Sequence, residues 1–186
     1  MPSPPQPKRH PYDQWAPDAR ALDLVGDKWT LLIVRDLSGG PRRFVELQRV
    51  LPGISTEQLR SRLNRMVADG LRTRRRYREV PPRVDYELTP RAHDLLPVIG
   101  ELARWGLVWA WGAPRPGERI DIGAIFRAAP GLVHMSGRTA TVELSVTLPD
   151  GRDTVSSLST DGQDVRRTEA PAPAPDARVG GTQDAW

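Results

Sequence analysis

The apolar residues of this chain change their period at Gly70, and this change limits the possible folds more than any other feature. Before Gly70 they recur with the spacing of amphipathic helices, whereas residues 71–78 and 83–88 alternate as β-strands do. The stiff segment 79–82, Glu-Val-Pro-Pro, separates the two strands as a hairpin tip. Short helices followed by a two-stranded hairpin predict an α+β domain.

Four short helices are predicted ahead of the hairpin. They cover residues 18–26, 27–37, 44–51 and 55–69. Asp27 can cap the second helix, and Pro52-Gly53 ends the third. Ser55 and Gln58 fit a capping box, in which their side chains satisfy backbone N–H groups at the start of the fourth helix. The expected buried stripe of the fourth helix consists of Leu59, Leu63, Met66 and Val67.

A last, longer helix is predicted after the hairpin. Thr89 can serve as its cap and Pro90 falls in its first turn. Its apolar side chains form two faces and extend to Trp109, and Pro97 is expected to kink it. One face can pack on its own domain, and the second needs a partner.

The remaining residues predict a small β-rich module. A linker over 112–117 leads to a short helix over 120–129. Residues 139–148 then alternate strongly, and a turn leads to a return strand over 154–158. The predicted organisation is a Pro-rich arm over 1–17, a mostly helical domain over 18–112, the β-rich module over 118–170 and a tail over 171–186.

Charge is unevenly distributed along the chain. Residues 1–116 hold 20 Lys or Arg against 13 Asp or Glu, whereas residues 117–186 hold 7 against 10. A basic front half favours a polyanionic partner. Arginine supplies 25 of the 27 basic residues, and its planar fork suits phosphate oxygens and guanine edges. A GC-rich genome produces the same bias, so the arginine content decides little alone.

Composition also excludes or disfavours several function classes. The 186 residues contain no cysteine, which excludes disulfides, thiolate catalysis and thiol redox sensing within them. His10, His93 and His134 share no ligand spacing, so neither a metal site nor a cofactor is expected. There is no phosphate-binding glycine loop and no nucleophile–base pair, and the protein is not expected to be an enzyme. With no bilayer-spanning apolar run and no signal-peptide core, a cytoplasmic protein without a membrane partner is expected.

Three short helices, a turn, a basic helix and a basic hairpin predict a winged helix-turn-helix, mostly helical with a two-stranded wing and followed by the small β-rich module. Residues 55–69 would cross the third helix as the recognition helix, with their polar side in the major groove of double-stranded DNA. Gln58 can read adenine, whereas Arg62 and Arg65 can read guanine or bind phosphate. A merely solvated basic face is the plain alternative for these arginines.

The hairpin adds a second basic surface. Arg72, Arg74 and Arg76 alternate onto one face of its first strand, where arginines commonly contact the DNA backbone or the minor groove. The expected DNA-binding residues are Arg42, Arg43, Ser55, Thr56, Gln58, Ser61, Arg62, Arg65, Arg74, Arg76 and Arg83.

These segments also resemble one family. Residues 21–30, Ala-Leu-Asp-Leu-Val-Gly-Asp-Lys-Trp-Thr, resemble the helix entry of the HxlR family of winged-helix transcriptional regulators. The most specific similarity is the wing segment 77–90, Tyr-Arg-Glu-Val-Pro-Pro-Arg-Val-Asp-Tyr-Glu-Leu-Thr-Pro. Further similar segments are 39–44, 51–55, 59–63 and 69–71, so that the match runs from about Tyr12 to Trp105.

The resemblance implies a homodimer that binds palindromic operator DNA, with the first and last helices building the interface. The residues expected at that interface are Tyr12, Trp15, Leu22, Val98, Leu102, Trp105 and Trp109. Many relatives place a redox-sensing cysteine where this chain reads Tyr12-Asp-Gln-Trp-Ala16, and Ala16 stands at that position. Thiol oxidation is therefore excluded as the trigger.

A small apolar or aromatic effector is expected instead. Its pocket would involve Trp15, Trp29, Trp105 and Trp109, although packing in the dimer core is the plainer interpretation of the tryptophans in the last helix. The β-rich module over 118–170 resembles the small sterol-carrier-like domain appended to some regulators of this family.

The sequence thus predicts a sequence-specific DNA-binding regulator, expected to be a repressor. Two other classes stay open. One is a constitutive DNA-binding protein without sequence preference, and the other is a protein-interaction module on a winged-helix scaffold.

Overall fold

The structure is a computed structural model that describes residues 11–77, 83–133 and 136–186, and for residues 74–77 and 83 it describes the backbone alone. It divides into two structural units. Unit 1 runs to Leu37 and resumes over Pro41–Leu95, whereas unit 2 consists of Ser38–Gly40 and Leu96–Trp186.

Three of the helices of unit 1 are capped by the residues predicted for this role, which are Asp27, Ser55 and Thr89. The helices of this unit are α1 (Pro17–Val25), α2 (Thr30–Leu37), α3 (Phe44–Val50), α4 (Thr56–Ala68) and α5 (Pro90–His93). Asp27 Oδ1 accepts hydrogen bonds from the backbone N–H groups of Trp29 at 2.8 Å and Thr30 at 3.1 Å, which caps α2. Ser55 and Gln58 form the predicted capping box, with both hydrogen bonds at 3.1 Å.

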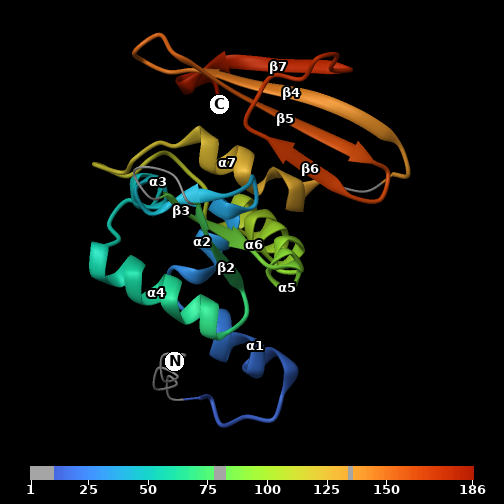
Figure 1. Cartoon of the computed structure of the whole chain (residues 1–186). Helices are drawn as coiled ribbons and strands as arrows, with labels where there is room; N and C mark the ends of the chain where they lie inside the picture. Colours follow the sequence, from blue (N-terminus) through green and yellow to red (C-terminus); the bar gives the residue numbers. More distant parts are fainter. Residues whose placement is uncertain (1–10, 78–82, 134–135) are drawn as a thin grey trace. The chain divides into compact units, whose positions relative to one another are not determined.

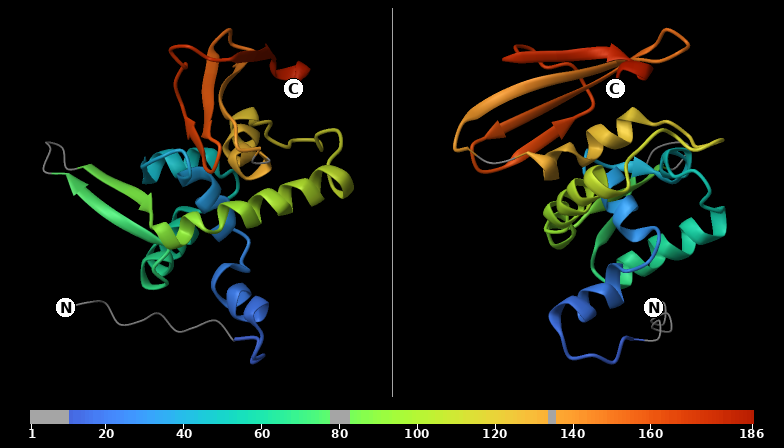
Figure 2. Two further views of the ribbon diagram at one scale, coloured as in Figure 1. Left: turned by 90° about the vertical axis from the view of Figure 1, so that its right-hand side faces the viewer. Right: turned by 180° about the vertical axis from the view of Figure 1, so that it is seen from behind.

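The wing is a three-stranded antiparallel sheet rather than the predicted pair. Strands β2 (Arg72–Tyr77) and β3 (Arg83–Leu88) form the expected hairpin, which projects to one side in the left view of Figure 2. A third strand, β1 (Arg42–Arg43), pairs with β3 on its other side, so the order is β1-β3-β2. A strand of two residues is too short to show an alternating pattern, which explains why the sequence did not reveal it.

The buried face of α4 confirms three of the four predicted core residues. Leu59, Leu63 and Met66 are buried, whereas the prediction was wrong for Val67, which is 46% exposed. Each residue turns a helix by about 100°, so a row of residues four apart drifts by about 40° at each step, and Val67 falls at the edge of the stripe rather than at its centre. The stripe packs in a core that includes Ile33, Val34, Leu37, Leu47 and Leu51.

The last predicted helix is two helices in the structure. Thr89 caps α5 as expected, but α5 ends at His93, and α6 (Leu96–Trp109) begins after a turn. The predicted kink at Pro97 was wrong because Pro97 falls in the first turn of α6, where an N–H group has no intrahelical partner to lose. Figure 2 shows α6 as one continuous helix. It groups with unit 2, not with the predicted domain over 18–112.

Unit 2 is a helix-backed mixed sheet (Figure 1). Its further elements are α7 (Ile122–Ala128), the 3-10 turns η1 (Ala129–Leu132) and η2 (Gln183–Ala185), and strands β4 (Thr139–Thr147), β5 (Asp153–Asp161), β6 (Val165–Thr168) and β7 (Ala177–Thr182). The strand order is β6-β5-β4-β7, with β7 parallel to β4. Residues 171–186, predicted as a tail, therefore contain an edge strand of this sheet.

The core of unit 2 forms between α7 and the sheet. Ile122, Phe126 and Val146 are buried together, as the predicted alternation of 139–148 requires. Trp186 meets the ring of Phe126 edge-on at 4.9 Å between centroids, and its indole N–H donates to the carbonyl of Ser145 at 3.1 Å. The chain end described here thus closes one side of this core.

Helix α6 and turn η1 approach at a pair of glycines. A Cβ placed on Gly100 would lie 1.9 Å from the carbonyl oxygen of Gly131, closer than any real contact. Beside the glycines, the Arg104 guanidinium donates to the carbonyls of Gly131 at 2.9 Å and Leu132 at 3.3 Å. Only a residue without a side chain at position 100 allows this contact.

Gly100→Ala is therefore expected to lower the free energy of unfolding by about 1–3 kcal/mol, the usual cost of overpacking a tight contact. Gly106→Ala is a matched control on the same helix, because nothing lies within 4 Å of a Cβ at Gly106. It should stabilise the protein by about 0.5–1 kcal/mol through helix propensity. Thermal unfolding of both variants measures this, and equal melting temperatures would contradict the contact.

Candidate nucleic-acid interface

Helix α4, predicted to be the recognition helix, is fixed on one flank by an ion pair. Arg62 Nη1 lies 3.0 Å from Asp27 Oδ2, and the two side chains are only 16% and 2% exposed. The same carboxylate caps α2 and accepts a hydrogen bond from the Thr30 hydroxyl. Arg62 was predicted to read guanine or bind phosphate, which stays a prediction, and in the structure its guanidinium holds α4 to the start of α2.

Helix α4 is also held by Arg72, the first residue of β2. Its Nε donates to the carbonyl of Leu63 at 2.6 Å, and its guanidinium lies 4.4 Å from the centre of the Tyr86 ring. Arg72 is only 3% exposed. The prediction that it adds to the basic face of the wing was wrong, since the side chain packs between α4 and the sheet.

With these contacts in place, α4 presents a polar face to solvent. Glu57, Arg60, Ser61 and Asn64 are all exposed on it. Arg60 and Glu57 form an ion pair at 3.1 Å with side chains 61% and 80% exposed. Ser61 is among the residues predicted to bind DNA, whereas Arg60 and Asn64 are not. The buried positions Leu59 and Leu63 could have indicated them. Arg60 and Asn64 directly follow these two leucines in the sequence, and this spacing places both at one edge of the exposed face.

The first turn of α4 is exposed and held by side-chain hydrogen bonds. Ser55 and Gln58 cap it, and Thr56 Oγ1 accepts a hydrogen bond from Gln48 Nε2 at 2.8 Å. Gln58 was predicted to read adenine, which needs its amide oxygen as well as its amide nitrogen. That oxygen already accepts a hydrogen bond from the backbone N–H of Ser55. Helix capping and adenine recognition therefore compete for the same amide oxygen.

The other predicted basic residues have different surroundings. Arg42 Nε donates to the carbonyl of Asp36 at 2.7 Å and is half-buried, whereas Arg43 is exposed at the start of α3. The strands carry the backbones of Arg74, Arg76 and Arg83, whose side chains lie outside the described residues.

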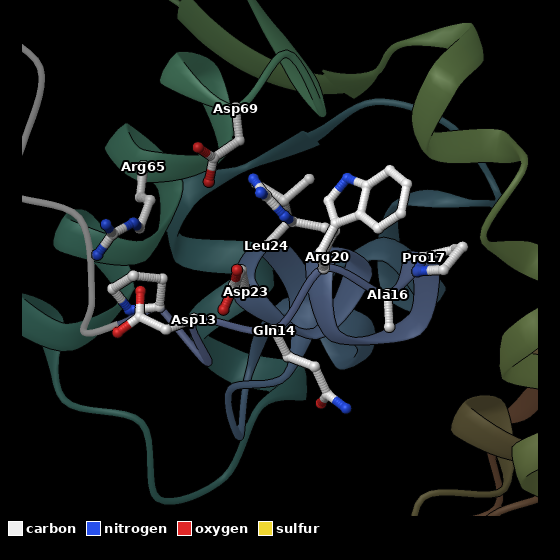
Figure 3. Close-up of a pocket in the computed structure, with 11 residues that line it drawn as sticks. Asp13, Gln14, Ala16, Pro17, Arg20, Asp23, Leu24, Arg65 and Asp69 are labelled. Carbon is white, nitrogen blue, oxygen red and sulfur yellow. The ribbon is translucent and has the colours of Figure 1, made fainter.

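Arg65 lies on the side of α4 that faces the N-terminal arm. It is half-buried and lines a hollow together with residues of the arm and of α1, as Figure 3 shows. Three carboxylates, Asp13, Asp23 and Asp69, line the same hollow. The acidic surroundings of Arg65 distinguish it from the exposed Arg60.

The four tryptophans predicted for an effector pocket differ in their surroundings. Trp29 is a core residue of unit 1 with 9% of its surface exposed, and the Lys28 ammonium lies 5.0 Å from its ring centre. Trp15 is 95% exposed in the arm, and Trp105 and Trp109 are exposed on α6. The effector pocket stays a prediction, and the structure places Trp29 in the core of unit 1.

The residues predicted for dimerisation share one property, which is exposure of a large apolar side chain. They are Tyr12, Trp15, Leu22, Val98, Leu102, Trp105 and Trp109. On α6 they are joined by Leu107 and Val108, both more than half exposed. Such a concentration of exposed apolar surface on one helix is typical of a protein–protein contact.

Across residues 11–77, 83–133 and 136–186, no helix is long and apolar enough to cross a membrane. Within the same ranges, no group of three or more acidic or histidine side chains is placed to hold a metal ion.

Comparison with known proteins gives concordant matches over the first half of the chain. The family model described as HxlR-like helix-turn-helix matches residues 24–112. A helix-turn-helix-type transcriptional regulator of Halalkalibacterium halodurans is 42% identical over 95 residues, which cover 50% of this chain and 84% of that protein. YkvN, another such regulator, from Bacillus subtilis, is 38% identical over 88 residues, covering 47% and 75%. The solved structure of the redox regulator HypR in its oxidized form is 32% identical with a TM-score of 0.50, covering 52% of this chain and 100% of that one.

The geometry predicts effects of very different size on stability for two arginines of α4. Arg62→Met removes the partner of a buried carboxylate and should destabilise unit 1 by about 3–5 kcal/mol. Arg60→Met removes a solvent-exposed pair and should change stability by less than about 1 kcal/mol. Urea denaturation of both variants measures the difference, and an Arg62→Met protein as stable as the wild type would show that the ion pair does not hold α4.

Proposed function

The chain belongs to the HxlR-like helix-turn-helix family of transcriptional regulators, and from that premise we propose that it binds a palindromic operator as a homodimer and represses transcription. It is a DNA-binding regulator and not an enzyme. Repression follows in this proposal because a dimer bound across a promoter excludes polymerase from the same stretch of duplex.

The observation that supports operator binding most directly is the exposed polar face of α4. Its residues Glu57, Arg60, Ser61 and Asn64 offer donors and acceptors of hydrogen bonds on a helix whose opposite side is buried. A helix of this kind fits the major groove, and its polar side chains can reach base edges. Because Arg62 and Arg72 tie α4 in place, little conformational freedom is lost when it binds DNA.

The homodimer is supported by the exposed apolar side chains of α6. Val98, Leu102, Trp105 and Trp109 are each more than half exposed, and burying them against a second copy would remove a large apolar area from water. A two-fold arrangement would place the two recognition helices about 34 Å apart, one turn of duplex DNA.

The trigger in this proposal is a small apolar or aromatic ligand. Thiol oxidation needs a sulfhydryl group, and these 186 residues contain no cysteine. The exposed tryptophans Trp15, Trp105 and Trp109 provide aromatic surface for such a ligand at the dimer contact. A ligand acts only if it binds one arrangement of the readers better than another.

Footprinting on the DNA that flanks the gene should reveal two protected half-sites about one helical turn apart, bound by a species of twice the 20.7 kDa chain mass. Affinity should fall by orders of magnitude, roughly 10³-fold or more, between 50 and 200 mM salt. Ser61→Glu, which adds a negative charge to the exposed face of α4, should abolish binding and derepress a reporter gene.

Ser159→Glu, which adds the same charge at an exposed position of β5, is the matched control and should bind like the wild type. Protection without a two-fold pattern, or equal binding by both variants, would refute the proposal.

Thermal-shift screening with phenols and aromatic carboxylic acids tests the trigger. The expected result is a compound that raises the melting temperature and weakens operator binding in the same concentration range, since both effects report one binding equilibrium. Compounds that raise the melting temperature and leave operator affinity unchanged would count against ligand control.

A further inference from the structure

The edge of α4 that faces β3 carries two polar side chains that are not among the residues predicted to bind DNA. Arg60 and Asn64 lie one helical turn apart and are both exposed. Together with Phe44 of α3 and Tyr86 of β3, they line a hollow in unit 1. This hollow lies on the opposite flank of α4 from the Asp27–Arg62 ion pair.

The contacts of α4 leave this edge as the part best able to meet a partner. Leu59, Leu63 and Met66 are buried, and Arg62 is held by Asp27 at 3.0 Å. Gln58 uses its amide oxygen for the capping box. Asn64 is thus a second exposed carboxamide on the helix, and no contact within the described residues assigns its amide a structural role in capping α4.

The chemistry of the two side chains differs in a useful way. A carboxamide presents an acceptor and a donor side by side, which matches N6 and N7 of adenine in the major groove. A guanidinium at the edge of a recognition helix carries a full charge and suits a backbone phosphate. The Glu57–Arg60 pair is solvent-exposed, so little free energy is needed to release Arg60 towards an anion.

We propose that Asn64 determines base preference by reading an adenine of the operator, and that Arg60 positions α4 by binding a phosphate at the edge of the same half-site. The proposal rests on the operator binding proposed above. It transfers the reading role from Arg62, which holds the fold, to Asn64, two residues further along α4 and on its exposed side.

The two roles predict different outcomes for a complete set of single-base operator substitutions. Asn64→Ala should reduce discrimination at one A·T pair of each half-site by about 10- to 100-fold, leaving preferences at other positions unchanged. Arg60→Ala should weaken binding to all sequences alike and lower the slope of log affinity against log salt by about one.

Matched controls lie on the β-rich module. Gln163→Ala removes an exposed carboxamide and Arg166→Ala an exposed guanidinium, and neither should alter the profile or the salt slope. Circular dichroism should show unchanged folding for all four variants, because each side chain is exposed.

Three outcomes separate the possibilities. A uniform loss with Asn64→Ala, or discrimination like that of the wild type, would overturn the assignment of Asn64 as the reader. A position-specific change with Arg60→Ala would overturn its role as a phosphate contact. If the wild type itself binds no operator, the proposed function fails before the roles of Asn64 and Arg60 are reached.

Discussion

The carboxylate of Asp27 is the contact on which the geometry of unit 1 depends. One oxygen accepts the backbone N–H groups that open α2, and the other pairs with Arg62 of α4. Because both contacts use the same group, the start of α2 and the middle of the recognition helix cannot shift independently. A buried ion pair of this kind contributes little net stability, but the loss of either partner leaves a charge without compensation. Its main effect is therefore on the direction in which α4 points.

Several other arginines also hold parts of the fold together, although the arginine-rich composition alone favours a DNA-binding role for them. Arg72 bonds to the carbonyl of Leu63, Arg127 pairs with Asp121 at 2.7 Å, and Arg167 bonds to Ser156 and Glu169. All three are less than 10% exposed. An arginine-rich sequence thus overstates its DNA-binding surface. Exposure separates the two groups of arginines, and the exposed ones among the described side chains of unit 1 are Arg20, Arg43, Arg49, Arg60 and Arg91.

The fold was largely predictable where local chemistry decides it. Asp27, Ser55 and Thr89 each cap the helix expected of them, because short polar side chains bond to nearby backbone groups wherever the chain folds. The wing hairpin followed from alternation. The missed features depend on distant contacts, among them β1, which exists only because β3 lies beside it, and β7, which pairs with β4 across a long connection. The side-chain contacts around α4 could not be predicted, since the partners of Arg62 and Arg72 are brought close only when α2 and β3 are in place.

The glycine pair at the α6–η1 crossing limits how this architecture can be rearranged. Gly100 leaves an indentation in the helix that only the backbone of η1 fills, so a truncated protein ending in the linker would expose a notch in mid-helix. Exchanging the module for one from another protein would require the same small residue at position 100 and a carbonyl turned towards it. The segment that contains η1 is therefore expected to fold together with α6. Replacing either one alone with a segment from another protein would lower the stability of the fold.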